Sequence, residues 1–406
     1  MHTSTVGILG GGTMGAGIAQ VAALHGWMVE LREVDEATAR RAIEGISSRL
    51  DQLVEKGRLS PEERDDAESR LCIARCPDCL SECELVIEAI VERLDVKAAA
   101  FRELLPCIRP DAILATNTSS LSVTQLGEAV GQPQRLVGMH FFNPAPVMKL
   151  VEVIAGVKSD PAVVDRVAHV AQQWGKVVAR ASDSPGFIVN HVARPYYLEA
   201  FRLLEDGFAG VEEIDAAMRE VGGFRMGPLE LADLIGLDIN TAAARSVWDQ
   251  LGRPVLLEPS ALQERLVAAG QLGRKTKRGC YDYHTQPPTP AIEIERRPVQ
   301  LSDGARDLIA RFAQRGAAMP GTELQNYIFA RILVCIFAQA TMACRRGVAQ
   351  REDIDTAMRY GVNYPRGPFE WMRLIGPDLC DQWLIALSAS AQTDRYRVAP
   401  LVDVAG

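Results

Sequence analysis

Short apolar runs typical of buried strands alternate with longer apolar stretches of helical spacing in the first half of the chain. The first run, 6–9, leads through a glycine-rich turn into a helical stretch that ends near His25, and 28–32 predicts a second strand. Further strand-like runs lie at 85–90, 112–116, 135–139, 150–154 and 176–180. This alternation predicts a doubly wound α/β domain of the Rossmann type over 1–184.

A helical hairpin is expected between the strands of this domain. Apolar residues recur at helical spacing between Ala37 and Gly57. The sequence 60–63 (SPEE) then has the signature of a helix start, because serine caps, proline suits the first helical position, and acids suit the first turn. The inserted hairpin therefore spans about 37–70.

From Pro185 onwards the strand-like runs stop and helical periodicity takes over, and an internal repeat lies in this part of the chain. A shift of 140 positions aligns three short motifs: 214–218 with 354–358, 227–230 with 367–370, and 234–236 with 374–376. We therefore expect two related all-α helical modules, 185–283 and 300–406. A proline-rich, charged linker, 284–299, should join them.

Bulk composition excludes several classes of protein. A chain of 406 residues is long enough for two or three domains, and its net charge of -8 argues against nucleic-acid binding. No apolar run reaches about 18 residues, so we expect no transmembrane helix. Nine scattered cysteines, an odd number, suit reduced thiols in the cytoplasm better than a disulfide framework.

Four of the cysteines, Cys72, Cys76, Cys79 and Cys83, form a cluster in the sequence. The C-x3-C-x2-C portion resembles an iron–sulfur spacing, and zinc is an alternative. However, Cys72 begins a strand-like segment and Cys83 directly precedes another. We therefore expect these cysteines to bind no metal.

The glycine-rich turn has the spacing of a dinucleotide-binding loop. Gly10, Gly12 and Gly15 form G-x-G-x-x-G between a strand and a helix, the context in which this motif cradles a pyrophosphate. Glu33 ends the second strand, where a carboxylate accepts ribose hydroxyls and repels a 2′-phosphate. This favours NAD over NADP, although the neighbouring Arg32 is a side chain that can receive that phosphate.

The segment 138–154 (GMHFFNPAPVMKLVEVI) carries the candidate chemistry. His140 ends one strand, and Glu152 lies in the next. Oxidation of an alcohol by NAD needs a base for the hydroxyl proton, and histidine suits that role near neutral pH. A buried carboxylate behind the ring would fix its tautomer and stabilise the imidazolium. Phe141 and Phe142 suggest surroundings that exclude water. The alternative is a structural histidine whose hydrogen bonds are satisfied within the core and which has no catalytic role.

Several blocks together resemble the L-3-hydroxyacyl-CoA dehydrogenase family, over nearly the whole chain and with a duplicated C-terminal helical domain. The blocks are GGGTMGAGIAQ, LVIEAIVE, ATNTSSLS, GMHFFNPAPVMKLVEVI, DSPGFIVN and GPLELADLIGLD. The resemblance includes the branch that acts on 3-hydroxybutyryl-CoA and 3-hydroxyadipyl-CoA. It implies an oxidoreductase of fatty-acid metabolism, including β-oxidation, that oxidises an L-3-hydroxyacyl-CoA to a 3-oxoacyl-CoA with hydride transfer to NAD.

The resemblance also implies roles for individual residues. His140 and Glu152 would be the catalytic dyad, and Ser119 and Asn190 would hydrogen-bond the substrate beside the reacting carbon. An alternative role for Ser119 is to cap the helix that follows it. The residues implied to bind NAD are Gly10, Gly12, Thr13, Met14, Gly15, Glu33, Glu92, Lys97, Ser119, Asn143 and Lys275. The resemblance implies that Lys56 binds the CoA end, and we infer that Arg49, on the same predicted helix, strengthens this phosphate contact.

The second helical module has lost polar groups that the first retains. Ala330 stands at the repeat position of Asn190, and Arg373 at that of Asp233. In simpler members of the family the helical domain forms a dimer interface. We therefore expect this degenerate module to pack on the first as an internal pseudo-dimer, and a homodimer of whole chains stays possible.

Two alternative functions remain open at this stage. One is a dehydrogenase of hydroxy acids such as L-gulonate, which would share the serine, histidine, glutamate and asparagine but lack CoA contacts. The other is a crystallin-like structural protein that retains nucleotide binding. The sequence also leaves the pathway open among β-oxidation, butyryl-CoA synthesis and degradation of aromatic acids through 3-hydroxyadipyl-CoA.

Overall fold

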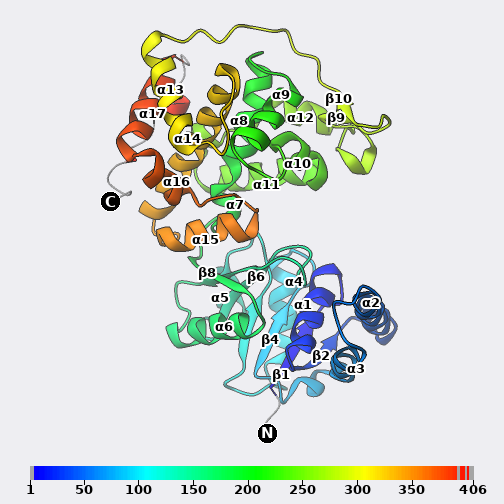
Figure 1. Cartoon of the computed structure of the whole chain (residues 1–406). Coiled ribbons are helices and arrows are strands. Elements are labelled where there is room, and N and C mark those ends of the chain that lie inside the picture. Colours follow the sequence, from blue (N-terminus) through cyan, green and yellow to red (C-terminus); the bar gives the residue numbers. More distant parts are fainter. Residues whose placement is uncertain (1–3, 391–393, 398–399, 402–406) are drawn as a thin grey trace. The chain divides into compact units, whose positions relative to one another are not determined.

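The chain forms two compact units that meet in the sequence between Phe187 and Ile188 (Figure 1). The computed structural model describes residues 4–390, 394–397 and 400–401. We describe each unit by itself.

The first unit is built on an eight-stranded sheet of order β3-β2-β1-β4-β5-β6-β7-β8. Its strands are β1 (Thr5–Leu9), β2 (Met28–Arg32), β3 (Leu71–Ile73), β4 (Leu85–Glu88), β5 (Ile113–Thr116), β6 (Leu136–Phe141), β7 (Leu150–Ala155) and β8 (Val177–Ser182). All neighbouring strands pair in parallel except β6 and β7, which are antiparallel. The strand order reverses at β1, the kind of switch point where doubly wound sheets bind ligands.

Helices cover both faces of this sheet, as the alternation of strands and helices predicted. They are α1 (Thr13–Leu24), α2 (Glu36–Glu55), α3 (Pro61–Ser69), η1 (Pro77–Leu80), α4 (Leu94–Leu104), α5 (Val123–Val130) and α6 (Pro161–Gln173). Apolar residues of α1 and α6 share one core cluster with alternate sheet residues such as Met139 and Val153. On the opposite face, a Cβ at Gly138 would lie 3.1 Å from the Val123 side chain of α5.

Helices α2 and α3 stand between β2 and β3, where the hairpin was expected. Helix α3 begins as its sequence indicates. The Ser60 hydroxyl accepts from the Glu63 amide at 3.1 Å, and the Glu63 carboxylate accepts from the Ser60 amide at 2.8 Å. This reciprocal capping satisfies two amides that would otherwise lack partners at the helix end.

The second unit is mainly helical. Its elements are α7 (Val189–Val192), α8 (Arg194–Glu205), α9 (Val211–Ala216), the π-helical turn η2 (Ala217–Val221), α10 (Pro228–Ile235), α11 (Leu237–Gln250), η3 (Val255–Leu257), α12 (Ala261–Ala268), η4 (Arg274–Thr276), β9 (Tyr281–Asp282), β10 (Thr289–Pro290), α13 (Asp303–Gly316), α14 (Glu323–Arg345), α15 (Arg351–Gly361), α16 (Pro368–Ile375), α17 (Pro377–Ser390) and η5 (Asp394–Tyr396).

The expectation that strands end at Pro185 is wrong in one place, because β9 and β10 pair as a short antiparallel ladder. Strand β10 lies inside 284–299, which was expected to be a plain linker. Further along, the Arg297 amide donates to the Gly207 carbonyl at 2.9 Å. Two paired residues are too few to produce a periodic signal, so the sequence pattern could not reveal this ladder.

The internal repeat has a structural counterpart in two buried aspartates. Asp215 accepts hydrogen bonds from the Leu229 and Glu230 amides, both at 2.9 Å, and so caps α10. Asp355, 140 positions later, accepts from the Phe369 and Glu370 amides at 2.8 and 3.0 Å and caps α16. Both copies therefore anchor the same helix start with the same residue type.

Helix α14 is long and apolar enough to cross a membrane by length and composition alone. However, 89% of its most apolar window is buried inside the structure. It packs against α8, α13 and α16. This burial is typical of a core helix. In the sequence, Arg331 interrupts the apolar run of this helix.

Candidate functional site

The antiparallel strands β6 and β7 bring His140 and Glu152 together. The two residues stand directly opposite each other in the register of the pair. The His140 ring nitrogen Nδ1 lies 2.7 Å from the Glu152 carboxylate oxygen Oε2. Both side chains are buried, with His140 6% and Glu152 0% exposed. Because Nδ1 contacts the carboxylate, Nε2 is the ring nitrogen left to exchange a proton.

Aromatic rings and one amide group fix the surroundings of His140. The ring centroids of Phe142 and Phe187 lie 4.6 and 5.9 Å from that of His140. The Asn117 side-chain oxygen accepts from the Phe141 amide at 2.8 Å, which ties the end of β6 to the loop after β5. Of the two phenylalanines expected here, Phe142 lies beside the histidine, whereas the Phe141 ring lies near Trp174 and Phe187 supplies the second neighbouring ring.

A buried lysine holds the loop between β6 and β7. The Lys176 ammonium donates to the carbonyls of Ala145 and Met148, at 2.5 and 2.9 Å. Burial lowers the pKa of Lys176 to about 8. The loop that it fastens includes Asn143, which is exposed. Lys176 was not singled out from the sequence, because a lysine at the start of a strand gives no sign of its distant partners.

The glycine-rich turn after β1 has the shape that a pyrophosphate requires. Gly10 has a φ of +96°, and a Cβ there would lie 2.7 Å from the Ala89 carbonyl oxygen. A Cβ at Gly15 would lie 1.9 Å from the Gly10 oxygen, so α1 can approach the turn only without a side chain. Gly12, by contrast, faces open space, and Thr13 behind it is exposed at the start of α1. The turn therefore leaves room for a ligand at the helix N-terminus.

A cleft of about 580 Å³ adjoins this turn. Its walls include Gly10, Glu33, Ala74, Arg75 and Glu103. The Glu33 carboxylate accepts from the Gly11 amide at 2.5 Å, which places it at the edge of the turn. The residues present thus fit the adenosine half of a dinucleotide.

Arg32, the side chain that left NADP open, is engaged elsewhere. Its guanidinium lies 2.5 Å from the Glu103 carboxylate. Because its charge is paired with Glu103, Arg32 is less suited to bind a 2′-phosphate. Together with Glu33 at the ribose position, this pairing favours NAD.

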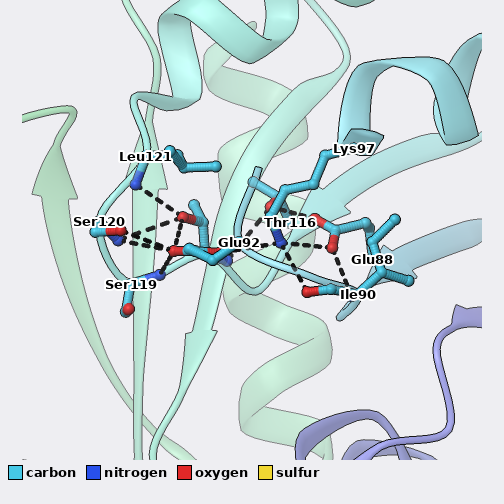
Figure 2. A network of polar contacts seen from close by, with 9 residues as sticks. Glu88, Ile90, Glu92, Lys97, Thr116, Ser119, Ser120 and Leu121 are labelled. Atoms are coloured by element: carbon cyan, nitrogen blue, oxygen red, sulfur yellow. Dashed lines mark hydrogen bonds and ion pairs between the residues drawn. The ribbon is translucent and has the colours of Figure 1, made fainter. Parts of the chain in front are cut away.

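Glu92 organises the loop that carries Ser119 (Figure 2). One carboxylate oxygen accepts from the Thr118 hydroxyl at 2.6 Å, the Ser119 amide at 3.0 Å, and the Ser120 amide and hydroxyl at 3.2 and 3.0 Å. Burial would raise the pKa of Glu92, but these hydrogen bonds and the charge of Lys97 outweigh it, so the pKa is lowered. The carboxylate therefore stays ionised and holds the loop through several donors.

Beside Glu92 lies a buried ion pair between Lys97 and Glu88 (Figure 2). The Lys97 ammonium is 2.6 Å from the Glu88 carboxylate and 3.1 Å from that of Glu92. Glu88 also accepts from the Thr116 hydroxyl at 2.7 Å. Burial raises the pKa of Glu88 against the opposing effect of Lys97. Lys97 is 1% exposed, and in this structure its role is to pair with Glu92.

Ser119 itself is exposed at the tip of this loop. The alternative in which it caps the following helix is wrong, because the residue that caps α5 is Ser122. The Ser122 hydroxyl accepts from the Gln125 amide at 3.1 Å and donates to the Asp183 carboxylate at 2.6 Å. The Ser119 hydroxyl therefore does not cap α5.

Two further candidates belong to the second unit. Asn190 lies in α7, and its side-chain oxygen accepts from the Arg194 guanidinium at 3.2 Å. The Lys275 ammonium lies 2.5 Å from the nearer carboxylate oxygen of Asp238. That Asn190 joins the dyad, and that Lys275 reaches NAD, both stay predictions.

The two residues expected to bind CoA lie on α2. The Arg49 guanidinium donates to the Gln20 side chain on α1 at 2.8 Å, while its buried Nη2 has no hydrogen-bond partner among the described residues. Lys56 is exposed at the C-terminal cap of α2. One half-buried and one exposed cation thus lie on the same helix.

Several residues that were not predicted from the sequence hold the loops and strands of the site in place. They are Glu88, Thr116, Asn117, Thr118, Lys176 and Asp183. One of them could have been found from the sequence. Glu88 ends the apolar strand β4, and a buried glutamate needs a partner. Among the described residues, no group of three or more potential ligands is placed to hold a metal ion.

Comparison with known proteins identifies the family of each part of the chain. The profile of the 3-hydroxyacyl-CoA dehydrogenase NAD binding domain matches residues 5–184. The profile of the 3-hydroxyacyl-CoA dehydrogenase C-terminal domain matches residues 186–283 and 327–405, so each matched segment carries one copy of the repeat.

Individual relatives agree with these profiles. A 3-hydroxyadipyl-CoA dehydrogenase of Escherichia coli K12 is 37% identical, over 99% of this chain and 97% of its own length. A 3-hydroxybutyryl-CoA dehydrogenase of Bradyrhizobium diazoefficiens is 42% identical over 70% of this chain and 97% of its own. The crystal structure of a 3-hydroxybutyryl-CoA dehydrogenase from Escherichia coli K12 superposes with a TM-score of 0.87, at 37% identity, covering 99% of this chain and 98% of that one.

Replacement of the loop-holding lysine should alter stability in a pH-dependent way. Lys176→Met leaves the Ala145 and Met148 carbonyls without a donor and should lower the free energy of unfolding by about 2 kcal/mol near neutral pH. The pKa of Lys176 is about 8 in the folded chain and about 10.4 in an unfolded one. Between these values the unfolded chain binds more protons, so folding gains stability from Lys176 as the pH rises.

The stability difference between wild type and Lys176→Met should therefore widen from about pH 8 to about pH 10, as measured by urea unfolding. Lys149→Met removes an exposed lysine from the same loop and serves as the matched control. Its free energy of unfolding should stay within about 0.5 kcal/mol of wild type. A constant difference for Lys176→Met across this range would contradict the assignment.

Proposed function

Because this chain belongs to the 3-hydroxyacyl-CoA dehydrogenase family and is an NAD-dependent 3-hydroxyacyl-CoA dehydrogenase, we propose that His140 is its general base and Glu152 the carboxylate that orients it. The observation that carries this proposal is the 2.7 Å contact between His140 Nδ1 and Glu152 Oε2. It leaves Nε2 as the nitrogen that accepts the proton of the substrate's 3-hydroxyl.

The proposed chemistry divides between the histidine and the cofactor. Bound NAD supplies the acceptor for the hydride that leaves carbon 3 of the substrate. His140 takes the hydroxyl proton in the same step and becomes an imidazolium. The buried Glu152 carboxylate stabilises this charge, because a charge-assisted hydrogen bond is strong where water is excluded. In the reverse direction, His140 returns the proton to the 3-oxo group.

Ser119 and Asn190 complete the proposed site by hydrogen-bonding the 3-oxygen and the thioester oxygen. A hydroxyl and an amide can hold both oxygens without competing for the transferred proton. For Ser119, support comes from its exposure and from the four hydrogen bonds by which Glu92 fixes its loop. We further propose that Glu92, Asn143 and Lys275 contact NAD, with Lys97 acting through Glu92.

Neither alternative function is favoured. The relatives reported above are named for acyl-CoA substrates, and one matches along nearly the whole chain. These facts disfavour an L-gulonate-type dehydrogenase. A crystallin-like structural role gives no reason for a histidine and a glutamate to be buried opposite each other on a ligand-binding edge. We propose short acyl chains as substrates, because the names of the relatives specify hydroxybutyryl and hydroxyadipyl groups.

Loss of proton transfer should strongly lower turnover without changing the affinity for the cofactor. His140→Gln or Glu152→Gln should lower kcat for 3-hydroxybutyryl-CoA by about a thousandfold, the middle of the range for loss of a general base. The affinity for NADH, measured by fluorescence titration, should stay within about twofold of wild type. Stopped-flow single-turnover measurements would show whether the hydride-transfer step itself has slowed.

His25→Gln is the matched control, because it replaces an exposed histidine of the same unit and should leave kcat unchanged. Near-normal turnover in either dyad variant would overturn the proposed mechanism.

We propose that Arg49 and Lys56 bind the phosphorylated nucleotide end of CoA. The buried Arg49 Nη2 without a partner among the described residues supports this, since a phosphate oxygen would satisfy it. Lys56 adds an exposed cation at the end of the same helix.

This CoA contact can be separated from catalysis with two substrates. Arg49→Met and Lys56→Met should each raise KM for 3-hydroxybutyryl-CoA by about tenfold, the loss expected for one charged hydrogen bond. Neither should change KM for the N-acetylcysteamine thioester of the same acid, which lacks the nucleotide. Arg41→Met, an exposed change on the same helix, serves as control. An equal rise in KM for both thioesters would count against the assignment.

We also propose that the two helical modules form an internal pseudo-dimer, with boundaries at 185–283, 284–299 and 300–406. Contacts between α8 and α14 support it. Arg331 of α14 donates to the Glu199 carboxylate of α8 at 3.0 Å, and the Tyr396 hydroxyl donates to the same group at 2.9 Å. Although burial alone would raise it, the charges of Arg202 and Arg331 hold the pKa of Glu199 below its usual value.

The pseudo-dimer predicts that the first helical module is insufficient by itself. A chain ended at about residue 290 should dimerise or aggregate in size-exclusion chromatography, because it exposes α8. In the full chain, Arg331→Met should lower the free energy of unfolding by about 3 kcal/mol, since it leaves a buried carboxylate without one of its cations. Arg306→Met removes a half-exposed ion pair with Glu323 and should cost less than about 1 kcal/mol. A truncated chain that is a fully active monomer would contradict the proposal.

We propose a cytoplasmic location, supported by nine cysteines that are all free thiols in the structure.

A further inference from the structure

Two of the clustered cysteines form a close, exposed pair beside the dinucleotide cleft. Cys76 and Cys79 flank Pro77 and Asp78 at the 3-10 turn η1, and their sulfur atoms lie 3.3 Å apart. Both residues are exposed. This separation is closer than an ordinary contact between two sulfur atoms, yet longer than the bond of about 2.05 Å that a disulfide requires. The two thiols are therefore poised to form that bond with a small movement.

The other two cysteines of the cluster are chemically inert by comparison. Burial raises the pKa of Cys83 to about 12, and burial together with the charge of Glu30 raises that of Cys72. Cys79 differs, because hydrogen bonds from the backbone and thiol of Cys76 lower its pKa. Since the thiolate is the reactive form, Cys79 is the nucleophile of the cluster. A pair of thiols also supplies only two of the four ligands that structural zinc needs.

The pair is joined directly to the wall of the cleft. Ile73, Ala74 and Arg75, the residues immediately before Cys76, all line it. The Arg75 guanidinium donates to the Glu36 carboxylate at 3.1 Å, and Glu36 lines the cleft as well. A bond between the sulfur atoms shortens their separation by about 1 Å. Because Cys76 directly follows Arg75 in the chain, we expect part of this movement to reach the backbone of the cleft wall.

We propose that Cys76 and Cys79 are a redox-active dithiol that small-molecule disulfides oxidise reversibly, and that the resulting disulfide weakens dinucleotide binding in the adjoining cleft. This inference goes beyond the dehydrogenase activity and does not depend on the proposed roles of His140 and Glu152.

The exchange takes place in two steps. The Cys79 thiolate attacks one sulfur of the small disulfide, whose S–S bond breaks to release one thiolate and leave a mixed disulfide on Cys79. Cys76 then loses its proton to solvent and attacks the Cys79 sulfur, which forms the Cys76–Cys79 bond and releases the second thiolate. Two electrons pass from the protein to the small disulfide, and excess dithiol reverses both steps.

The test uses the full-length protein and oxidised glutathione. After treatment and removal of the reagent, peptide mapping should find one disulfide, Cys76–Cys79. The Kd for NADH, measured by fluorescence titration, should rise about fivefold, the size expected for one displaced hydrogen-bonding contact. Dithiothreitol should restore the original Kd. NADH binding is measured without substrate, so the result is independent of the catalytic proposal.

Single variants identify the order of attack. Cys76→Ser should retain glutathione on residue 79, because the resolving thiol is missing, and Cys79→Ser should form no disulfide. In both variants the Kd for NADH should stay within about twofold of its untreated value. Cys344→Ser, which removes a half-buried thiol of the second unit, should behave as wild type. Absence of the Cys76–Cys79 bond, a disulfide through another cysteine such as Cys107, or an unchanged Kd in the oxidised protein would each overturn the proposal.

Discussion

The antiparallel pairing of β6 with β7 is the constraint on which the rest of the proposed site depends. Every other neighbouring pair in the eight-stranded sheet is parallel. The reversal brings the end of β6 and the start of β7 to one edge, so that His140 faces Glu152 across a single rung. A slip of one residue would turn Glu152 towards the opposite face, where Val151 and Val153 pack with α1 and α6. The apolar core thus fixes the register that joins the two polar side chains.

Buried charges around Lys97 are the second element that shapes the site. Burial of Lys97 with Glu88 costs desolvation free energy, and such groups add little to stability compared with apolar packing. Their effect here is positional. Lys97, itself paired with Glu88, contacts Glu92, and Glu92 in turn holds the loop of Ser119 through four hydrogen bonds (Figure 2). An irregular loop has no backbone hydrogen-bond ladder of its own, so the Glu92 carboxylate supplies the order that a strand or helix would provide.

The sequence pattern predicted the parts of this molecule that depend on residues close together in the chain. Periodicity located the main strands, and glycine spacing located the turn of Gly10 and Gly15. The dyad was also visible, because a histidine and a glutamate lay on consecutive strand-like runs. The contacts of Lys176 with its two carbonyls and of Glu88 with Thr116 were not predicted, since they join residues 28 to 31 positions apart and leave no periodic signal. A linker with paired strand residues at its start was missed for a similar reason, as two residues make no period.

The repeat shows which features of the helical module are structural and which are not. Both copies keep the aspartate that caps a helix start, Asp215 and Asp355, so this capping belongs to the fold itself. The central contact of the proposed pseudo-dimer is asymmetric. Arg331 pairs with Glu199, whereas the repeat positions of these two residues hold His191 and Gln339. A symmetric dimer of identical modules would bury this ion pair twice. Duplication within one chain allows the second occurrence to lose both its carboxylate and its guanidinium, which avoids the desolvation of another such pair in the same core.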